Sequence, residues 1–260
     1  MKLKICVAVL LCVMALAGTF ACSGGVSKAP NGMTASEILA SCQNASASIN
    51  TLQLDMTMHM AAMGDELNMS ASISEDKPNR KVYAAETSPM FTGEIEVYVL
   101  DNEMYMSNPM AKAKWVKTPL TEDLFRQALD FGVNQELIVL NNCTNAKYIG
   151  RETIGGTDCY KITVNPNPAA LLSAFNVSGL GNVSPSDAVK SSSCTVWVDG
   201  STYYLLKMSC DMTLKFETST GLLNSVFTTF NINQPVNIVL PAEAQNATAL
   251  TNAQFESGNW

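Results

Sequence analysis

The chain has 260 residues, of which 47% are hydrophobic and 15% are charged, with 16 basic and 23 acidic side chains. This composition is typical of a globular protein with a sizeable core, and an acidic chain without a cluster of lysine and arginine is a poor nucleic-acid binder. The single histidine, His59, argues against most metal and acid–base chemistry.

The N-terminal residues predict export. Two lysines precede an unbroken apolar run over residues 5–17, which suits a signal peptide and is too short to span a bilayer as a helix. Small residues then lead to Cys22 in a pattern that resembles a bacterial lipobox, although Thr19 and Phe20 depart from its usual form. We expect residues 1–21 to be a signal peptide and Cys22 to be lipidated, with ordinary secretory cleavage as the alternative.

Lipidation of Cys22 would make the protein a cell-membrane-anchored lipoprotein on the extracytoplasmic side. Each buried methylene of the lipid contributes about 0.8 kcal/mol, and several chains together hold a protein on a membrane. Residues 22–33 are small and polar enough to serve as a tether. The chain from Cys22 onward keeps 14 of the 16 basic residues and all 23 acidic ones, a net charge of about −9.

Five cysteines follow Cys22, and their spacing shows neither a CxxC motif nor a zinc ribbon, so we expect no metal site. Outside the cytoplasm one or two disulfides are plausible, but an odd count leaves at least one thiol free. The sequence leaves the pairing open among Cys42, Cys143, Cys159, Cys194 and Cys210.

A helix followed by a hairpin begins the folded domain. Thr34 and Glu37 have the spacing of a capping box, which predicts a helix from Thr34 to about Ser48. From Thr51 the hydrophobic period becomes two, and apolar residues alternate with polar ones up to Met60. The same alternation returns over residues 67–74 after a turn, which predicts an antiparallel hairpin.

Most of the remaining chain also alternates with a period of two. Helical stripes interrupt the strands at residues 121–130 and 168–175, and residues 135–140 form a short element of undetermined type. Residues after Ala244 are polar, and we expect a frayed tail over 245–260. The further strands are predicted at 81–86, 94–100, 104–106, 114–117, 146–151, 159–164, 194–199, 203–214, 225–232 and 236–240.

These elements predict one α+β domain over residues 34–244. Its centre is a curved antiparallel sheet of about eleven strands, a half-barrel whose concave face is covered by helices. No stretch rich in glycine or proline divides the domain.

The order of these elements resembles the LolA/LolB-like fold, in particular lipoproteins of the LppX/LprG type and related uncharacterised lipoproteins. The matching stretches are the capped helix and first strand (34–60), Met104 to Lys117, Gly156 to Ile162, Val196 to Lys207 and the final Ile-Val-Leu-Pro. Each stretch is short, and the resemblance lies in their order over most of the chain. It implies an apolar cavity between sheet and helices, which in better-known members holds acyl chains.

Methionines are concentrated on the first hairpin. Alternation places Met56, Met58, Met60 and Met69 on one face, and flexible thioether side chains suit a surface that adapts to varied apolar ligands. An ordinary core sealed by the helices is the alternative interpretation. A copper(I) site is a third, but His59 points to the opposite face from Met58 and Met60.

Catalytic motifs are missing from the sequence: it has no Gly-x-Ser-x-Gly elbow, phosphate loop or His-Glu-x-x-His. We therefore expect no enzyme and no cofactor, although a hydrolase built around His59 is a further alternative.

The sequence favours a membrane-tethered protein that binds a lipid or other hydrophobic ligand in an apolar cavity, for lipid or lipoprotein transport. A structural or protein-interaction lipoprotein with a sealed core is the alternative. The predicted partners are the membrane and a hydrophobic ligand such as an acyl chain. The residues predicted to line the cavity are Leu54, Met56, Met58, Met60, Met69, Ile73, Trp115 and Trp197.

Overall fold

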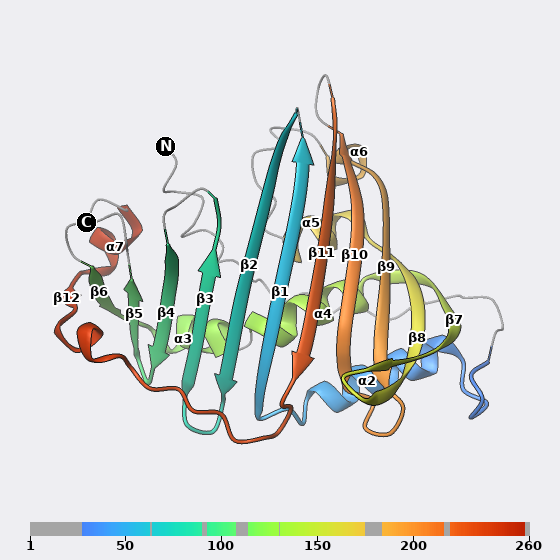
Figure 1. Ribbon diagram of the computed structural model, residues 1–260, viewed down its shortest axis with the longest axis horizontal. Helices are drawn as coiled ribbons and strands as arrows, with labels where there is room; N and C mark the ends of the chain where they lie inside the picture. The colour runs from blue at the N-terminus through green and yellow to red at the C-terminus, as the bar shows by residue number, and fades with distance from the viewer. Residues whose placement is uncertain are drawn as a thin grey trace.

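The computed structural model describes residues 28–62, 64–89, 93–107, 114–129, 131–174, 184–215 and 219–257 (Figure 1). Cys22 and the predicted signal peptide lie outside these residues. Within them, no helix has the length and apolar character needed to cross a membrane.

Twelve strands form one open sheet, in the order β12-β6-β5-β4-β3-β2-β1-β11-β10-β9-β8-β7. Neighbours are antiparallel, except that the short β12 runs parallel to β6. The predicted antiparallel half-barrel of about eleven strands is thus confirmed with twelve strands, although the short β12 was not expected and the predicted strand at 236–240 does not form. The strands are β1 (Thr51–Ala62), β2 (Asp65–Asp76), β3 (Lys81–Thr87), β4 (Glu94–Leu100), β5 (Glu103–Ser107), β6 (Trp115–Pro119), β7 (Cys143–Ile154), β8 (Thr157–Pro166), β9 (Val189–Asp199), β10 (Leu205–Lys215), β11 (Thr220–Phe230) and β12 (Thr248–Ala249).

Two meanders build this sheet. The first, β1 to β6, runs from the middle of the sheet to one edge, and the second, β7 to β11, returns from the opposite edge (Figure 1). They meet where β1 pairs with β11, so that Met56 lies opposite Phe227.

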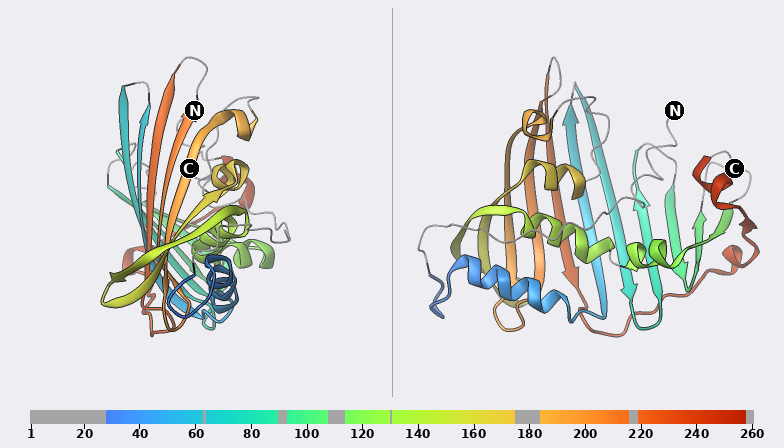
Figure 2. Two further views of the ribbon diagram at one scale, coloured as in Figure 1. Left: turned by 90° about the vertical axis from the view of Figure 1, so that its right-hand side faces the viewer. Right: turned by 180° about the vertical axis from the view of Figure 1, so that it is seen from behind.

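The helices gather on one face of the sheet, here called the inner face (Figure 2). They are α2 (Ala35–Ser46), α3 (Glu122–Leu129), α4 (Phe131–Asn141), α5 (Pro168–Ala174) and α6 (Pro185–Ala188). Thr34 caps α2 as predicted: the Glu37 amide donates to Thr34 Oγ1 at 3.3 Å, and the Thr34 amide donates to Glu37 Oε2 at 2.7 Å. The residues 135–140, whose type was open, belong to α4.

One large hydrophobic core fills the space between the inner face and the helices. It joins Ile38, Leu39 and Cys42 of α2 to strand residues such as Leu52 and Val196. Cys194 and Cys210, neighbours on β9 and β10, form a disulfide within this core. The free cysteines Cys42, Cys143 and Cys159 are buried.

The C-terminal residues differ from the sequence prediction in two respects. Residues 236–240 are extended but form no strand, because they cross the opposite, outer face of the sheet instead of extending its edge. The expected frayed tail is wrong for residues 245–257: they continue as the 3-10 helix η1 (Ala242–Asn246), β12 and α7 (Asn252–Ser257), and Phe255 is buried. Pairing with β6 and burial of Phe255 hold this segment.

Candidate functional site

Four methionines form a wall on the inner face near the free ends of β1 and β2. Met58 lies directly opposite Met69, while Met56 pairs with Ala71 and Met60 with Leu67. We call Met56, Met58, Met60 and Met69 the methionine wall. All four are half-buried, so their thioether groups are within reach of solvent or a ligand.

The inner face changes character along β1. Leu52 and Leu54 are 0% and 1% exposed, and the facing Ile73 is 4% exposed, because the helices cover this end of the sheet. The tips of β1 and β2 extend past the helices (Figure 2). Leu54 and Ile73, predicted to line a cavity, therefore lie in the sealed floor below the methionine wall.

The structure places Trp115 and Trp197 on the outer face, away from the other predicted lining residues. Trp115 packs with Tyr98, 6.0 Å between ring centroids, beneath Ile238 and Ala244 of the C-terminal segment. The Trp197 ring lies 5.3 Å from Lys161 Nζ and 4.9 Å from Lys207 Nζ. Both indoles stabilise the sheet from outside, and neither belongs to the candidate site.

Acidic and hydroxyl side chains interrupt the apolar inner face, and no motif in the sequence predicted them. Glu86 of β3 lies opposite Ala71, which in turn lies opposite Met56, and Ser225 of β11 lies opposite Met58. Both residues are therefore at the level of the methionine wall. Burial raises the pKa of Glu86. Their only signal in the sequence is their position in the apolar phase of an alternating strand, where a polar residue is out of place.

A second polar group lies deeper in the core. Glu136 of α4 is 3% exposed and accepts a long hydrogen bond of 3.5 Å from Thr229 Oγ1. Burial raises the pKa of Glu136 to about 8, against the effect of the Thr229 hydrogen bond and with the help of the negative charge of Glu75. Glu136 in turn adds to the effect of burial in raising the pKa of Cys42 to about 12. These groups lie where the helices close over the sheet.

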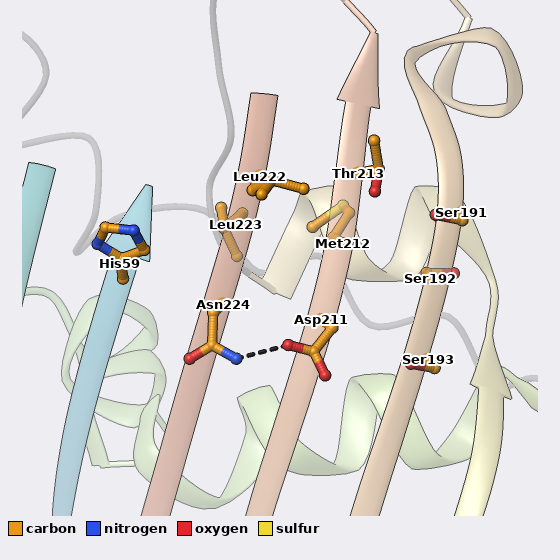
Figure 3. Close-up of a pocket in the computed structure, with 10 residues that line it drawn as sticks. All are labelled: His59, Ser191, Ser192, Ser193, Asp211, Met212, Thr213, Leu222, Leu223 and Asn224. Carbon is orange, nitrogen blue, oxygen red and sulfur yellow. Dashed lines mark hydrogen bonds between the residues drawn. The ribbon is translucent and has the colours of Figure 1, made fainter. Parts of the chain in front are cut away.

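His59 lies on the outer face, as the alternation predicted. Its Nδ1 is 2.8 Å from Asn68 Oδ1. It lines a pocket of about 320 Å³ that crosses the ends of β1, β11, β10 and β9 (Figure 3). Asn224 Nδ2 donates to Asp211 Oδ1 in this pocket at 2.6 Å. The other lining residues are Ser191, Ser192, Ser193, Met212, Thr213, Leu222 and Leu223.

The pocket contains serine, histidine and aspartate, but their arrangement is not that of a hydrolase triad. Ser193 lies three strands from His59, which separates their Cα atoms by about 14 Å at the usual strand spacing. A nucleophilic serine must hydrogen-bond its base directly. No group of three or more potential metal-ligating side chains is found among the residues described.

Comparisons with known structures support the architecture. The chain is similar to the lipoprotein LppX of Mycobacterium tuberculosis, with a TM-score of 0.50, 15% identity and coverage of 79% of this chain and 98% of LppX. It is similar to LprF of Mycobacterium bovis, with a TM-score of 0.51, 17% identity and coverage of 83% and 99%. The chain therefore shares its fold with these LppX-type lipoproteins, the type that the order of its elements resembles.

Three further comparisons give less information about this chain. A LolA superfamily protein of Nitrosomonas europaea matches over 79% of this chain and 96% of its own, at 11% identity, but its TM-score of 0.31 is too low to carry an argument. Residues 34–135 match the model of a family described as of unknown function, DUF6612. No curated protein matches the sequence.

Proposed function

We propose that this protein binds a lipid or other hydrophobic ligand against the methionine wall. The supporting observation is the half-exposure of Met56, Met58, Met60 and Met69 beside a sealed apolar floor. Burying apolar ligand surface here gains about 25 cal/mol per Å², and flexible thioethers adapt to chains of different shape. The similarity of the fold to LppX and LprF agrees with an extracytoplasmic lipoprotein.

Cys22 is proposed as the lipid anchor that keeps this site near a membrane. A lipidated Cys22 would incorporate radiolabelled palmitate, and Cys22→Ser would release the protein from the membrane fraction. Absence of label from the wild-type protein, or a Cys22→Ser variant that stays on the membrane, would remove the anchor from the proposal.

Ligand binding is tested on the full chain carrying Cys22→Ser, with a fluorescent probe that bears a neutral hexadecyl chain. We expect saturable binding that Met58→Asp weakens at least tenfold, because the carboxylate would have to be desolvated against the chain. Thr57→Asp is the matched control: Thr57 is the next residue on β1 and is exposed on the outer face, so binding should not change.

Met69→Asp and its neighbour Asn68→Asp repeat the comparison on β2. A wild-type protein that binds no probe would favour the alternative, a structural or protein-interaction lipoprotein with a sealed core. Equal effects of the inner-face and outer-face variants would show that the probe binds elsewhere. Thermal unfolding of all four variants checks that a loss of binding is not a loss of fold.

A further inference from the structure

Two polar residues flank the methionine wall on the inner face. On one side, Glu86 of β3 lies opposite Ala71, which itself lies opposite Met56. On the other side, Ser225 of β11 lies opposite Met58. Strands β1 and β2 separate them, and Glu86 is level with Met56 but Ser225 with Met58, so their Cα atoms are about 14 Å apart across the strands and about 7 Å apart along them. An alkyl chain lying on the wall thus has a polar residue at either side.

Both flanking residues carry a buried oxygen without a hydrogen-bond partner. Ser225 is 0% exposed, and its Oγ has none. Oε1 of Glu86 is buried and also has none. Buried polar atoms in native structures are nearly always hydrogen-bonded, because an unmet bond costs the full desolvation of the group. Two such atoms beside one half-exposed apolar wall point to a ligand that supplies the missing bonds.

The electrostatics of the inner face limit the charge of that ligand. No lysine, arginine or histidine is buried among the residues that the structure describes, whereas Glu75 and Glu136 are buried in the same core. Burial favours the neutral form of Glu86, which raises its pKa. A carboxylate or phosphate head group would meet no buried counter-charge here and would face acidic neighbours instead.

We infer that the site selects amphiphiles with an uncharged, hydrogen-bonding head group, such as a hydroxyl or ester, over those with an anionic one. The Glu86 carboxyl accepts a hydrogen bond from a head-group hydroxyl, and the Ser225 hydroxyl donates to an ester carbonyl or accepts from a hydroxyl. The alkyl chain lies on the methionine wall between them. This inference rests on the proposed function and adds the class of ligand.

The test is competition against the hexadecyl probe at pH 7, using 1-monooleoylglycerol and oleate below their aggregation concentrations. The two competitors share one acyl chain and differ only in the head group. We expect 1-monooleoylglycerol to compete at least tenfold better than oleate. Glu86→Lys should reverse this preference, because the new cation pairs with the oleate carboxylate. Thr87→Lys, the exposed neighbour on β3, should leave the preference unchanged.

Ser225→Ala provides a second measurement that does not depend on the folding of Glu86→Lys. It should weaken the binding of 1-monooleoylglycerol several-fold and leave the binding of oleate and of the probe unchanged. Equal competition by the two lipids, or equal loss of both in Ser225→Ala, would overturn the inference while probe binding still supports the proposed function. A chain that binds no probe would overturn the proposed function itself.

Discussion

The two halves of strand β1 share one alternating pattern but differ in what covers them. Near its start, Leu52 and Leu54 are sealed beneath the helices, while Met56, Met58 and Met60 remain half-exposed towards its tip. The change from branched residues to methionine coincides with the change in cover. Strand β1 thus supplies both a sealed floor and an adaptable surface. The boundary between the two lies where the cover of helices ends.

The largest expected effect comes from the sealed half. Leu54→Ala should lower the free energy of unfolding by about 2–5 kcal/mol, because it leaves a cavity in a packed core. Met58→Ala should cost about 1 kcal/mol or less, since Met58 is already half-exposed. Urea unfolding monitored by circular dichroism measures both. Similar losses of unfolding free energy in the two variants would show that Met58 is packed as tightly as Leu54, so that the two halves of β1 would not differ.

Glu136, which lies between the sealed floor and the helices, should make the stability of the protein depend on pH. The pKa of Glu136 is about 8 in the folded state against an ordinary 4.5, so the folded protein holds a proton that the unfolded chain releases. Its contribution to stability is complete below about pH 4.5 and is lost as the pH rises towards about 8, by up to about 1.4 kcal/mol per pH unit.

Glu136→Gln should therefore flatten the decline of the melting temperature between pH 5 and pH 8. Glu122→Gln is the control, because Glu122 is exposed and its pKa is lowered by its hydrogen bonds from Arg80 and Arg126. A wild-type protein whose stability does not fall over this range would contradict the assignment of a buried, protonated Glu136.

A smaller effect on stability is expected when the methionine wall is made stiffer. Replacing Met56, Met58 and Met60 together by leucine conserves volume and should change stability by less than about 1.5 kcal/mol per substitution. Competition by straight and methyl-branched alkyl chains should then discriminate between shapes more sharply than in the wild type. Unchanged selectivity would show that methionine is dispensable as an adaptable lining.

The smallest effect is expected on the outer face of the same strand. Thr57→Ala should change stability by less than about 0.5 kcal/mol, because Thr57 is exposed and away from the packed layers. Comparing its melting temperature with that of Met58→Ala measures the difference between the two faces at adjacent residues. A larger loss for Thr57→Ala would mean that the outer face is covered by something not yet identified.

The sequence correctly predicted the strands that have one buried face and one solvent-exposed face. The alternation from Leu52 to Met60, the capping box at Thr34 and the opposite direction of His59 are all found in the structure. It could not orient Trp197, because its neighbours Val196 and Val198 are also buried and the alternation disappears. Residues 236–240 show a strand's pattern but pack across the sheet, since periodicity does not reveal which face they meet.

The acidic residues of the inner face illustrate a different difficulty. The sequence pattern assigned no role to Glu75, Glu86 or Glu136, and glutamate is almost never fully buried in proteins. Only the register of the strands places Glu75 and Glu86 on the inner face, and only the position of α4 buries Glu136. The floor was thus predictable from hydrophobic patterning, whereas the polar groups that would give the site its selectivity required the fold.

The meeting of the two meanders has a consequence for how the protein is made. Contacts within each meander join residues that are close along the chain, but Met56 pairs with Phe227, 171 residues later. Pairings so distant carry a high entropic cost of loop closure and slow the folding of a sheet. We expect the β1–β11 pairing to form last. The β1–β11 pairing brings Ser225 next to the methionine wall. We therefore expect the binding surface to form only in the final step of folding.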